Sequence, residues 1–141
     1  MRENPTSFKK MLIARFQRKG GSGIFTMPFD DLPEPSKHEL LLKSEFDENE
    51  LGVITCYFDK SNWLLITTNK IVWSTNDNTQ SLENKKIKDV TIGLSLESHK
   101  TITRKEGISH LGIIDLVGKK YSIKIEPGKP LFAIWNVMKY L

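Results

Sequence analysis

The chain has 141 residues, 38% hydrophobic and 27% charged, which is typical of one soluble globular domain. This composition excludes collagen-like and wholly disordered chains, and no apolar run approaches the ~20 residues of a membrane-spanning helix. The single cysteine, Cys56, excludes an internal disulfide framework and favours a reducing compartment. The N-terminal segment lacks the long apolar stretch of a secretory signal, so we expect a cytoplasmic location.

The net charge of +4 is unevenly distributed along the chain. Residues 1–23 carry +5, whereas residues 24–141 carry −1. A pI near 9.1 usually suggests nucleic-acid binding, but here the basic excess belongs to an N-terminal arm, and we expect no nucleic-acid partner. A transit peptide is the alternative interpretation of the arm, although the serine enrichment of such peptides is lacking. The candidates for contact with an anionic surface are Lys9, Lys10, Arg15, Arg18 and Lys19.

The arm is predicted to form an amphipathic helix that begins at Asn4-Pro5, a capping residue followed by a residue suited to the first turn. Residues 20–23, Gly-Gly-Ser-Gly, are expected to end the helix and to act as a flexible joint. We expect the helix to dock on its own domain, with a second copy of the chain or an external partner as alternatives. Its apolar stripe, at helical spacing, consists of Phe8, Met11, Leu12 and Phe16.

Residues 24–37 contain several prolines and are predicted to be an extended lead-in, and strands are predicted from residue 38 onward. The predicted strands cover residues 53–58, 63–68, 71–74, 86–90, 92–97, 110–116 and 119–125, with a polar loop at 76–81.

The pattern changes to helical after Glu126-Pro127-Gly128. The apolar residues of this C-terminal helix recur at helical spacing, and we expect all four to be buried: Leu131, Ile134, Trp135 and Met138. The fold class is therefore mainly β with α. We expect a curled antiparallel sheet or partly open barrel of six or seven strands, capped by the C-terminal helix and accompanied by the N-terminal one.

The segment from Trp63 to Trp73, Trp-Leu-Leu-Ile-Thr-Thr-Asn-Lys-Ile-Val-Trp, resembles the pleckstrin-homology superfamily, in particular its GRAM-like and bacterial PH-like branches. In that superfamily a hairpin with a hydrophobic–Thr–Asn–basic–hydrophobic–aromatic centre carries the second and third strands. The matching residues are Leu65, Thr68, Asn69, Lys70, Ile71, Val72 and Trp73. With residues 86–90 and 131–140, the resemblance covers residues 38–141 and implies a PH-like domain, but it does not settle a function.

No catalytic, cofactor-binding or metal-binding constellation is found in the sequence, and we expect no enzymatic activity. The histidines His38, His99 and His110 lack partners at zinc-ligand spacing. Cys56 lies within an apolar strand, where burial makes a thiol inert. The adjacent acids at 30–31 and 47–48 point apart on an extended chain, so we interpret them as solubilising or capping groups.

Basic clusters also lie at predicted strand ends, where charged side chains are normally solvated. They consist of Lys85, Lys86 and Lys88, then Lys100, Arg104 and Lys105, and finally Lys119, Lys120 and Lys124. In phosphoinositide-binding relatives, the anion site centres on the loop that joins the first two strands. Here that loop is residues 59–62, with one base and one acid, so we expect no selective lipid head-group site.

The function expected from these observations is a non-enzymatic binding module that acts through a protein–protein interface. Its most concrete form is a small bacterial immunity-type inhibitor of a cognate toxin, because we expect a compact, stand-alone domain without a fused effector domain. The alternative is a membrane-surface adaptor that binds anionic lipids through the basic arm and the PH-like body. An enzyme or nucleic-acid binder is the third hypothesis, but Trp63 and Trp73 are expected in the core rather than on a stacking platform.

Overall fold

The computed structural model of the chain describes residues 4–93 and 109–141. Two antiparallel sheets and three α-helices make up the described part of the fold. The five-stranded sheet has the order β1 (Thr26–Pro28), β2 (Gly52–Asp59), β3 (Asn62–Thr67), β4 (Lys70–Thr75) and β5 (Asn78–Glu83). The three-stranded sheet has the order β6 (Ile87–Gly93), β7 (His110–Asp115) and β8 (Lys120–Lys124). The helices are α1 (Pro5–Arg18), α2 (Glu34–Ser44) and α3 (Lys129–Met138), with 3-10 turns η1 (Phe29–Asp31) and η2 (Asn84–Lys86).

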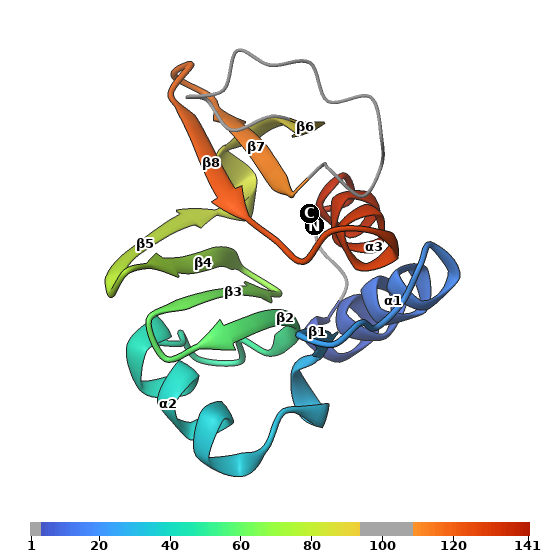
Figure 1. The fold of residues 1–141 in the computed structure, drawn as a ribbon, viewed down its shortest axis with the longest axis vertical. Helices are drawn as coiled ribbons and strands as arrows, with labels where there is room; N and C mark the ends of the chain where they lie inside the picture. The colour runs from blue at the N-terminus through green and yellow to red at the C-terminus, as the bar shows by residue number, and fades with distance from the viewer. Residues whose placement is uncertain (1–3, 94–108) are drawn as a thin grey trace.

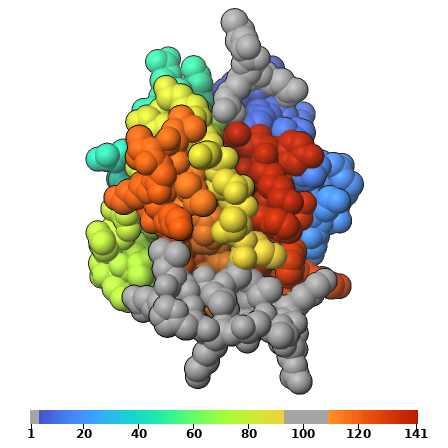
Figure 2. All heavy atoms as spheres, turned by 90° about the horizontal axis from the view of Figure 1, so that it is seen from above, coloured from blue at the N-terminus to red at the C-terminus, as the bar shows by residue number. Residues whose placement is uncertain are grey.

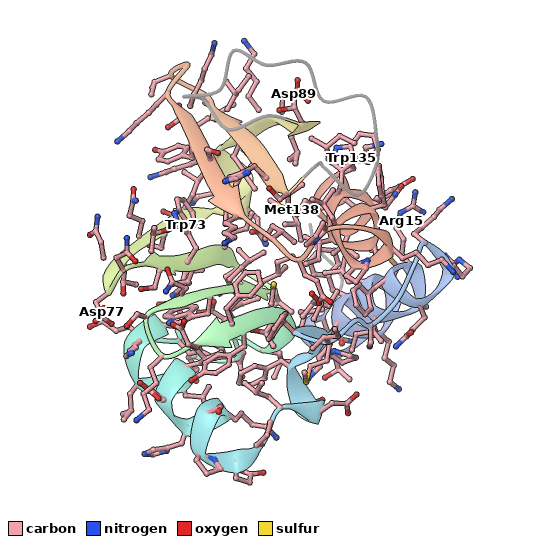
Figure 3. The ribbon with its side chains drawn as sticks, in the orientation of Figure 1. Arg15, Trp73, Asp77, Asp89, Trp135 and Met138 are labelled. Carbon is pink, nitrogen blue, oxygen red and sulfur yellow. The ribbon has the colours of Figure 1, made fainter. Side chains whose placement is uncertain are left out.

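The main core lies between the two sheets and is closed by α1 and α3 (Figure 1). Trp73 points from β4 toward β8 and meets Tyr121 edge-on, with the ring centroids 5.5 Å apart (Figure 3). This contact joins the five-stranded sheet to the three-stranded one. The expected antiparallel β fold with a helix at each end of the chain is thus confirmed. The expectation of a single sheet of six or seven strands is wrong, because the described residues form eight strands in two sheets and a third helix.

A smaller core lies on the opposite face of the five-stranded sheet, under α2. Strand β3 has apolar residues on both faces: Leu64 and Ile66 belong to the main core, whereas Trp63 and Leu65 pack in the smaller one. Leu40 of α2 is fully buried in this second core. Both tryptophans of the hairpin are therefore core residues, as expected.

The expected extended lead-in at 24–37 is wrong. This segment contains β1, η1 and the first turn of α2, which continues to Ser44. Pro33 is the N-cap residue of α2 and Pro35 lies in its first turn, where a missing N–H costs no intrahelical hydrogen bond. The prolines therefore mark the start of a helix, and residues 38–44 are helical rather than strand.

The polar loop expected at 76–81 is also wrong, because only its first two residues form a turn. Asn76 and Asp77 both have positive φ, at 51° and 68°, which these two residue types tolerate in a tight hairpin turn. Strand β5 follows, and its polar side chains face solvent while Leu82 alone is buried. The predicted strands at 86–90 and 92–97 form one strand, β6, as far as Gly93, and residues 94–97 lie outside the described residues.

The N-terminal helix forms as expected, with the Asn4 side chain accepting the N–H of Ser7 at 2.9 Å. Phe8, Leu12 and Phe16 are buried in the main core against α3 and β2, so the helix docks on its own domain. Met11 remains 36% exposed.

The flexible joint expected at 20–23 is instead a packed turn. A Cβ atom on Gly20 would lie 2.3 Å from the Lys129 carbonyl oxygen, and one on Gly23 would lie 2.4 Å from Cγ of Pro130. The glycines therefore allow this turn to approach the start of α3.

Helix α3 buries three of the four predicted residues, Leu131, Ile134 and Met138. Trp135 is only half-buried, so the expectation of full burial is wrong for this residue. Its indole reaches β6, where Nε1 donates to the Val90 carbonyl at 3.1 Å, and Lys139 lies over the ring (Figure 3). The indole N–H thus has its acceptor within the protein, while the ring stays partly exposed beneath Lys139. None of the helices in the described residues is long and apolar enough to cross a membrane.

Candidate functional site

The five basic residues of the arm do not form one anionic-surface site. Lys9 forms an ion pair with Asp30 at 2.8 Å, and the Arg15 guanidinium lies 3.7 Å from the Tyr140 ring centroid. Arg15 Nε also donates to the Asn136 carbonyl at 3.3 Å, which ties α1 to α3 (Figure 3). The exposed cations are Lys10, Arg18 and Lys19. Most of the apolar stripe that would accompany them at a lipid surface is already buried in the protein core.

The cysteine and the described histidines do not form a nucleophilic or metal-binding site within the described residues. Burial raises the pKa of the Cys56 thiol to about 11, so the reactive thiolate is scarce at neutral pH. His38 is exposed, and His110 lies with Nδ1 3.0 Å from the Ser109 hydroxyl. His99 lies outside the described residues. Within residues 4–93 and 109–141, no group of three metal-ligating side chains comes together.

The turn between β2 and β3 is stabilised by hydrogen bonds to Asp59 and does not place basic side chains around an anion site. Asp59 Oδ1 accepts the N–H groups of Ser61 at 2.8 Å and Asn62 at 2.9 Å. The hydrogen bond from Ser61, followed by that from the Asn62 side chain, holds the pKa of Asp59 below its usual range. The carboxylate therefore stays charged at this turn, which is unfavourable for a phosphate ligand.

The Thr-Asn-Lys segment that carries the family resemblance is fastened to the loop before β2. Lys70 Nζ lies 3.3 Å from Glu50 Oε1 and donates to the Glu45 carbonyl at 3.0 Å. The Thr67 hydroxyl donates to the other oxygen of the fully buried Glu50 carboxylate. This buried ion pair with its hydrogen bonds positions the β3–β4 hairpin, and it leaves Lys70 committed to internal partners.

Parts of two of the three basic clusters come together in the structure, namely Lys86 of the first cluster with Lys119 and Lys120 of the third. The backbone N–H of Leu116, which precedes the third cluster, donates to the carbonyl of Lys86 in the first cluster at 3.0 Å. Lys86 therefore lies against the β7–β8 turn, which contains Lys119 and leads into Lys120 at the start of β8. The remaining cluster, Lys100, Arg104 and Lys105, lies outside the described residues.

The β7–β8 turn presents the most exposed apolar pair of neighbours in the described residues. Leu116 is 63% exposed and Val117 is 88% exposed. Beside them lies a hollow of about 430 Å³, whose walls are more apolar than polar. Its lining consists of Leu82, Lys86, Asp115, Leu116, Val117 and Tyr121. We call the turn at 116–119 the β7–β8 tip, and the hollow beside it the tip hollow.

The tip is held in one conformation by Asp115. Oδ1 of Asp115 accepts the N–H groups of Val117 at 3.0 Å and Lys119 at 2.9 Å, and Oδ2 accepts the Tyr121 hydroxyl at 3.0 Å. Desolvation alone would raise the pKa of Asp115, but these hydrogen bonds, that from Lys119 first, keep its pKa below the usual range. A tip held in this way loses little conformational entropy on binding.

The tip and the arm face different sides of the molecule. The β7–β8 tip lies at the upper left of Figure 1 and α1 at the right. Figure 2 shows α3, in red, between the orange strands β7 and β8 and the blue helix α1. The basic arm and the tip therefore do not combine into one flat surface.

The sequence predicts Lys86, Lys119 and Lys120 at solvated strand ends, and its local pattern does not connect Lys86 with the other two. The missing signal was Leu116-Val117, two consecutive apolar residues directly before Gly118, where a turn is normally polar. No protein-family model matches the chain, and no curated protein matches it.

Proposed function

We propose that this chain is a non-enzymatic binding module with a PH-like fold that acts through a protein–protein interface at the β7–β8 tip. The PH-like assignment is supported by the order of elements. A meander of β2 to β5 precedes a second meander of β6 to β8, and α3 closes the open side between them. The elements α1, β1 and α2 are additions to that plan.

The observation that carries the proposed function is the exposure of Leu116 and Val117 on a fixed turn beside an apolar hollow. Exposed apolar residues that cluster on a rigid turn are typical of contact sites for other molecules. Aromatic and aliphatic side chains around a hollow supply the apolar centre of an interface, and the lysines supply its polar rim.

The most concrete form of this function is an immunity-type inhibitor, which needs a shaped surface and no chemistry. The membrane-surface adaptor requires an available apolar stripe on the arm, and Phe8, Leu12 and Phe16 are buried. We therefore propose no second function.

The experiment co-expresses the chain with each protein that is encoded beside its gene, and it measures growth of the host. We expect one neighbour to arrest growth and the chain to restore it by forming a complex that persists in size-exclusion chromatography. The double variant Leu116→Asp/Val117→Asp should fail to protect. The control Leu42→Asp, at a position 67% exposed on α2, should protect fully. Protection that is independent of the tip would overturn the proposal.

A further inference from the structure

Building on the proposed function, we infer that the tip hollow receives an apolar side chain from an acidic segment of the partner protein. Two properties of the site lead to this partner chemistry. The hollow supplies a concave apolar seat, and the lysines around it supply a positive rim.

The seat has walls from three parts of the chain: Leu82 of β5, Tyr121 of β8, and Leu116 with Val117 of the tip. Tyr121 is fixed from two sides, by its hydroxyl on Asp115 at 3.0 Å and by its edge-on contact with Trp73. A concave apolar seat with fixed walls accommodates a branched or aromatic side chain by shape. Its volume of about 430 Å³ leaves room for such a side chain.

The charges around the seat favour carboxylates. Lys86 lines the hollow, and Lys119 Nζ lies over the ring of Tyr121, 5.1 Å from its centroid. Lys120 is exposed next to them. A partner segment with Asp or Glu on either side of its apolar residue would therefore meet opposite charge, which raises the association rate and fixes register.

The acidic groups near the seat are already engaged. The Glu83 carboxylate forms ion pairs with Lys85 at 3.3 Å and Lys86 at 3.4 Å. The Asp115 carboxylate, which also lines the hollow, accepts hydrogen bonds from the Val117 N–H and the Tyr121 hydroxyl. Of the cations at the seat, Lys119 and Lys120 form no ion pair within the described residues. Lys119 and Lys120 therefore leave an excess of positive charge beside the seat.

A protein segment fits this site better than a lipid surface does. A fluid bilayer gains nothing from a fixed concave seat, whereas a side chain of a folded or extended segment does. The basic helix α1, which would strengthen attraction to an anionic bilayer, lies on another side of the molecule (Figures 1 and 2). Binding to anionic vesicles is accordingly an outcome that contradicts the inference.

The experiment selects a random peptide library, displayed on phage, on the full chain and counter-selects it on Leu116→Asp/Val117→Asp. Both residues are largely exposed, so this variant should keep the thermal unfolding midpoint of the wild type. We expect the surviving peptides to share an apolar residue between Asp or Glu residues. Charge reversal at Lys119 and Lys120 should weaken a selected peptide by about tenfold. Reversal at Lys10 and Lys19 of the arm, the matched control, should leave its affinity unchanged.

Each other outcome overturns a defined part of the inference. Tip-dependent peptides without acidic residues would contradict the partner chemistry and leave the proposed function standing. A selection that yields no tip-dependent peptide would contradict the docking site itself and, with it, the proposed function. Tip-dependent co-sedimentation with phosphatidylserine vesicles, in the absence of tip-dependent peptides, would identify a membrane as the occupant.

Discussion

The carboxylate of Glu126 accepts the backbone N–H of Ile24 at 2.7 Å and joins two segments that lie 102 residues apart. The same carboxylate accepts the N–H of Phe25 at 2.9 Å and the Thr26 hydroxyl at 2.8 Å. Glu126 is only 8% exposed, so its charge is compensated by these donors rather than by water. This contact fastens the start of β1 to the segment that leads from β8 into α3.

Replacing Glu126 by Gln should destabilise the fold by about 1–3 kcal/mol. The –NH₂ group of the glutamine cannot accept a hydrogen bond, so at least one of the three donors would lose its acceptor. Urea unfolding, followed by circular dichroism, measures the change. Glu48→Gln, at an exposed position before β2, is the matched control and should leave the midpoint unchanged. Equal midpoints for the two variants would show that the Glu126 cluster contributes no net stability.

Gly20→Ala should destabilise the fold by about 1–3 kcal/mol more than Gly118→Ala does. Both glycines have positive φ, at 145° and 90°, so both variants carry a backbone penalty. Only at Gly20 would the new Cβ also collide with the Lys129 carbonyl oxygen, at 2.3 Å, whereas Gly118 is surrounded by open space. Thermal midpoints of the two variants give the comparison. A smaller loss for Gly20→Ala would restore the interpretation of residues 20–23 as a loose joint.

Leu12→Ala should cost about 2–5 kcal/mol, as truncation of a fully buried leucine does. Leu12 is completely buried between α1 and the main core, whereas its neighbour Met11 is 36% exposed. Met11→Ala is therefore expected to cost less than about 1 kcal/mol. Denaturant midpoints measure both variants, and the mass in solution should stay that of the wild type. Similar small losses for both would mean that α1 is not docked on its own domain in solution.

The sequence pattern was sufficient for the elements whose apolar residues follow a regular period. Most apolar residues at helical spacing in α1 and α3 are buried, and so is the unbroken apolar run of β3. Met11 and Trp135 follow the same spacing but stay partly exposed. Helix α2 does not follow from the sequence pattern, because Pro33 and Pro35 predict an extended chain. Its signal was indirect: Trp63 and Leu65 made the second face of β3 apolar, and an apolar face needs a cover.

The candidate site was less predictable, because it depends on pairing between distant segments. Lys86 and Leu116 are brought together by the register of β6 with β7, in which Ile87 is opposite Asp115. No local pattern specifies that register. The role of Asp115 could not be predicted for the same reason, since its hydrogen bonds with Val117, Lys119 and Tyr121 form only when the turn is folded.

The Asp115–Tyr121 hydrogen bond should make two pKa values depend on each other. The pKa of Tyr121 is raised above 10, first by desolvation and then by the hydrogen bond and charge of Asp115. In Asp115→Asn, which keeps the shape of the side chain and removes its charge, the pKa of Tyr121 should fall toward 10. Titration of the Tyr121 ring carbons by NMR measures this shift, with Tyr57 and Tyr140 as internal controls.

The same variant should change the dependence of stability on pH. The pKa of Asp115 in the folded protein lies below its ordinary value of 3.8, so the ionised carboxylate stabilises the fold above that pH. This contribution is lost as the pH falls through the lowered pKa. The wild type should therefore be more stable than Asp115→Asn at neutral pH, and the difference should shrink below about pH 3.8. Urea midpoints collected from neutral to acidic pH measure it. A difference that is independent of pH would mean that the charge of Asp115 does not hold the β7–β8 tip.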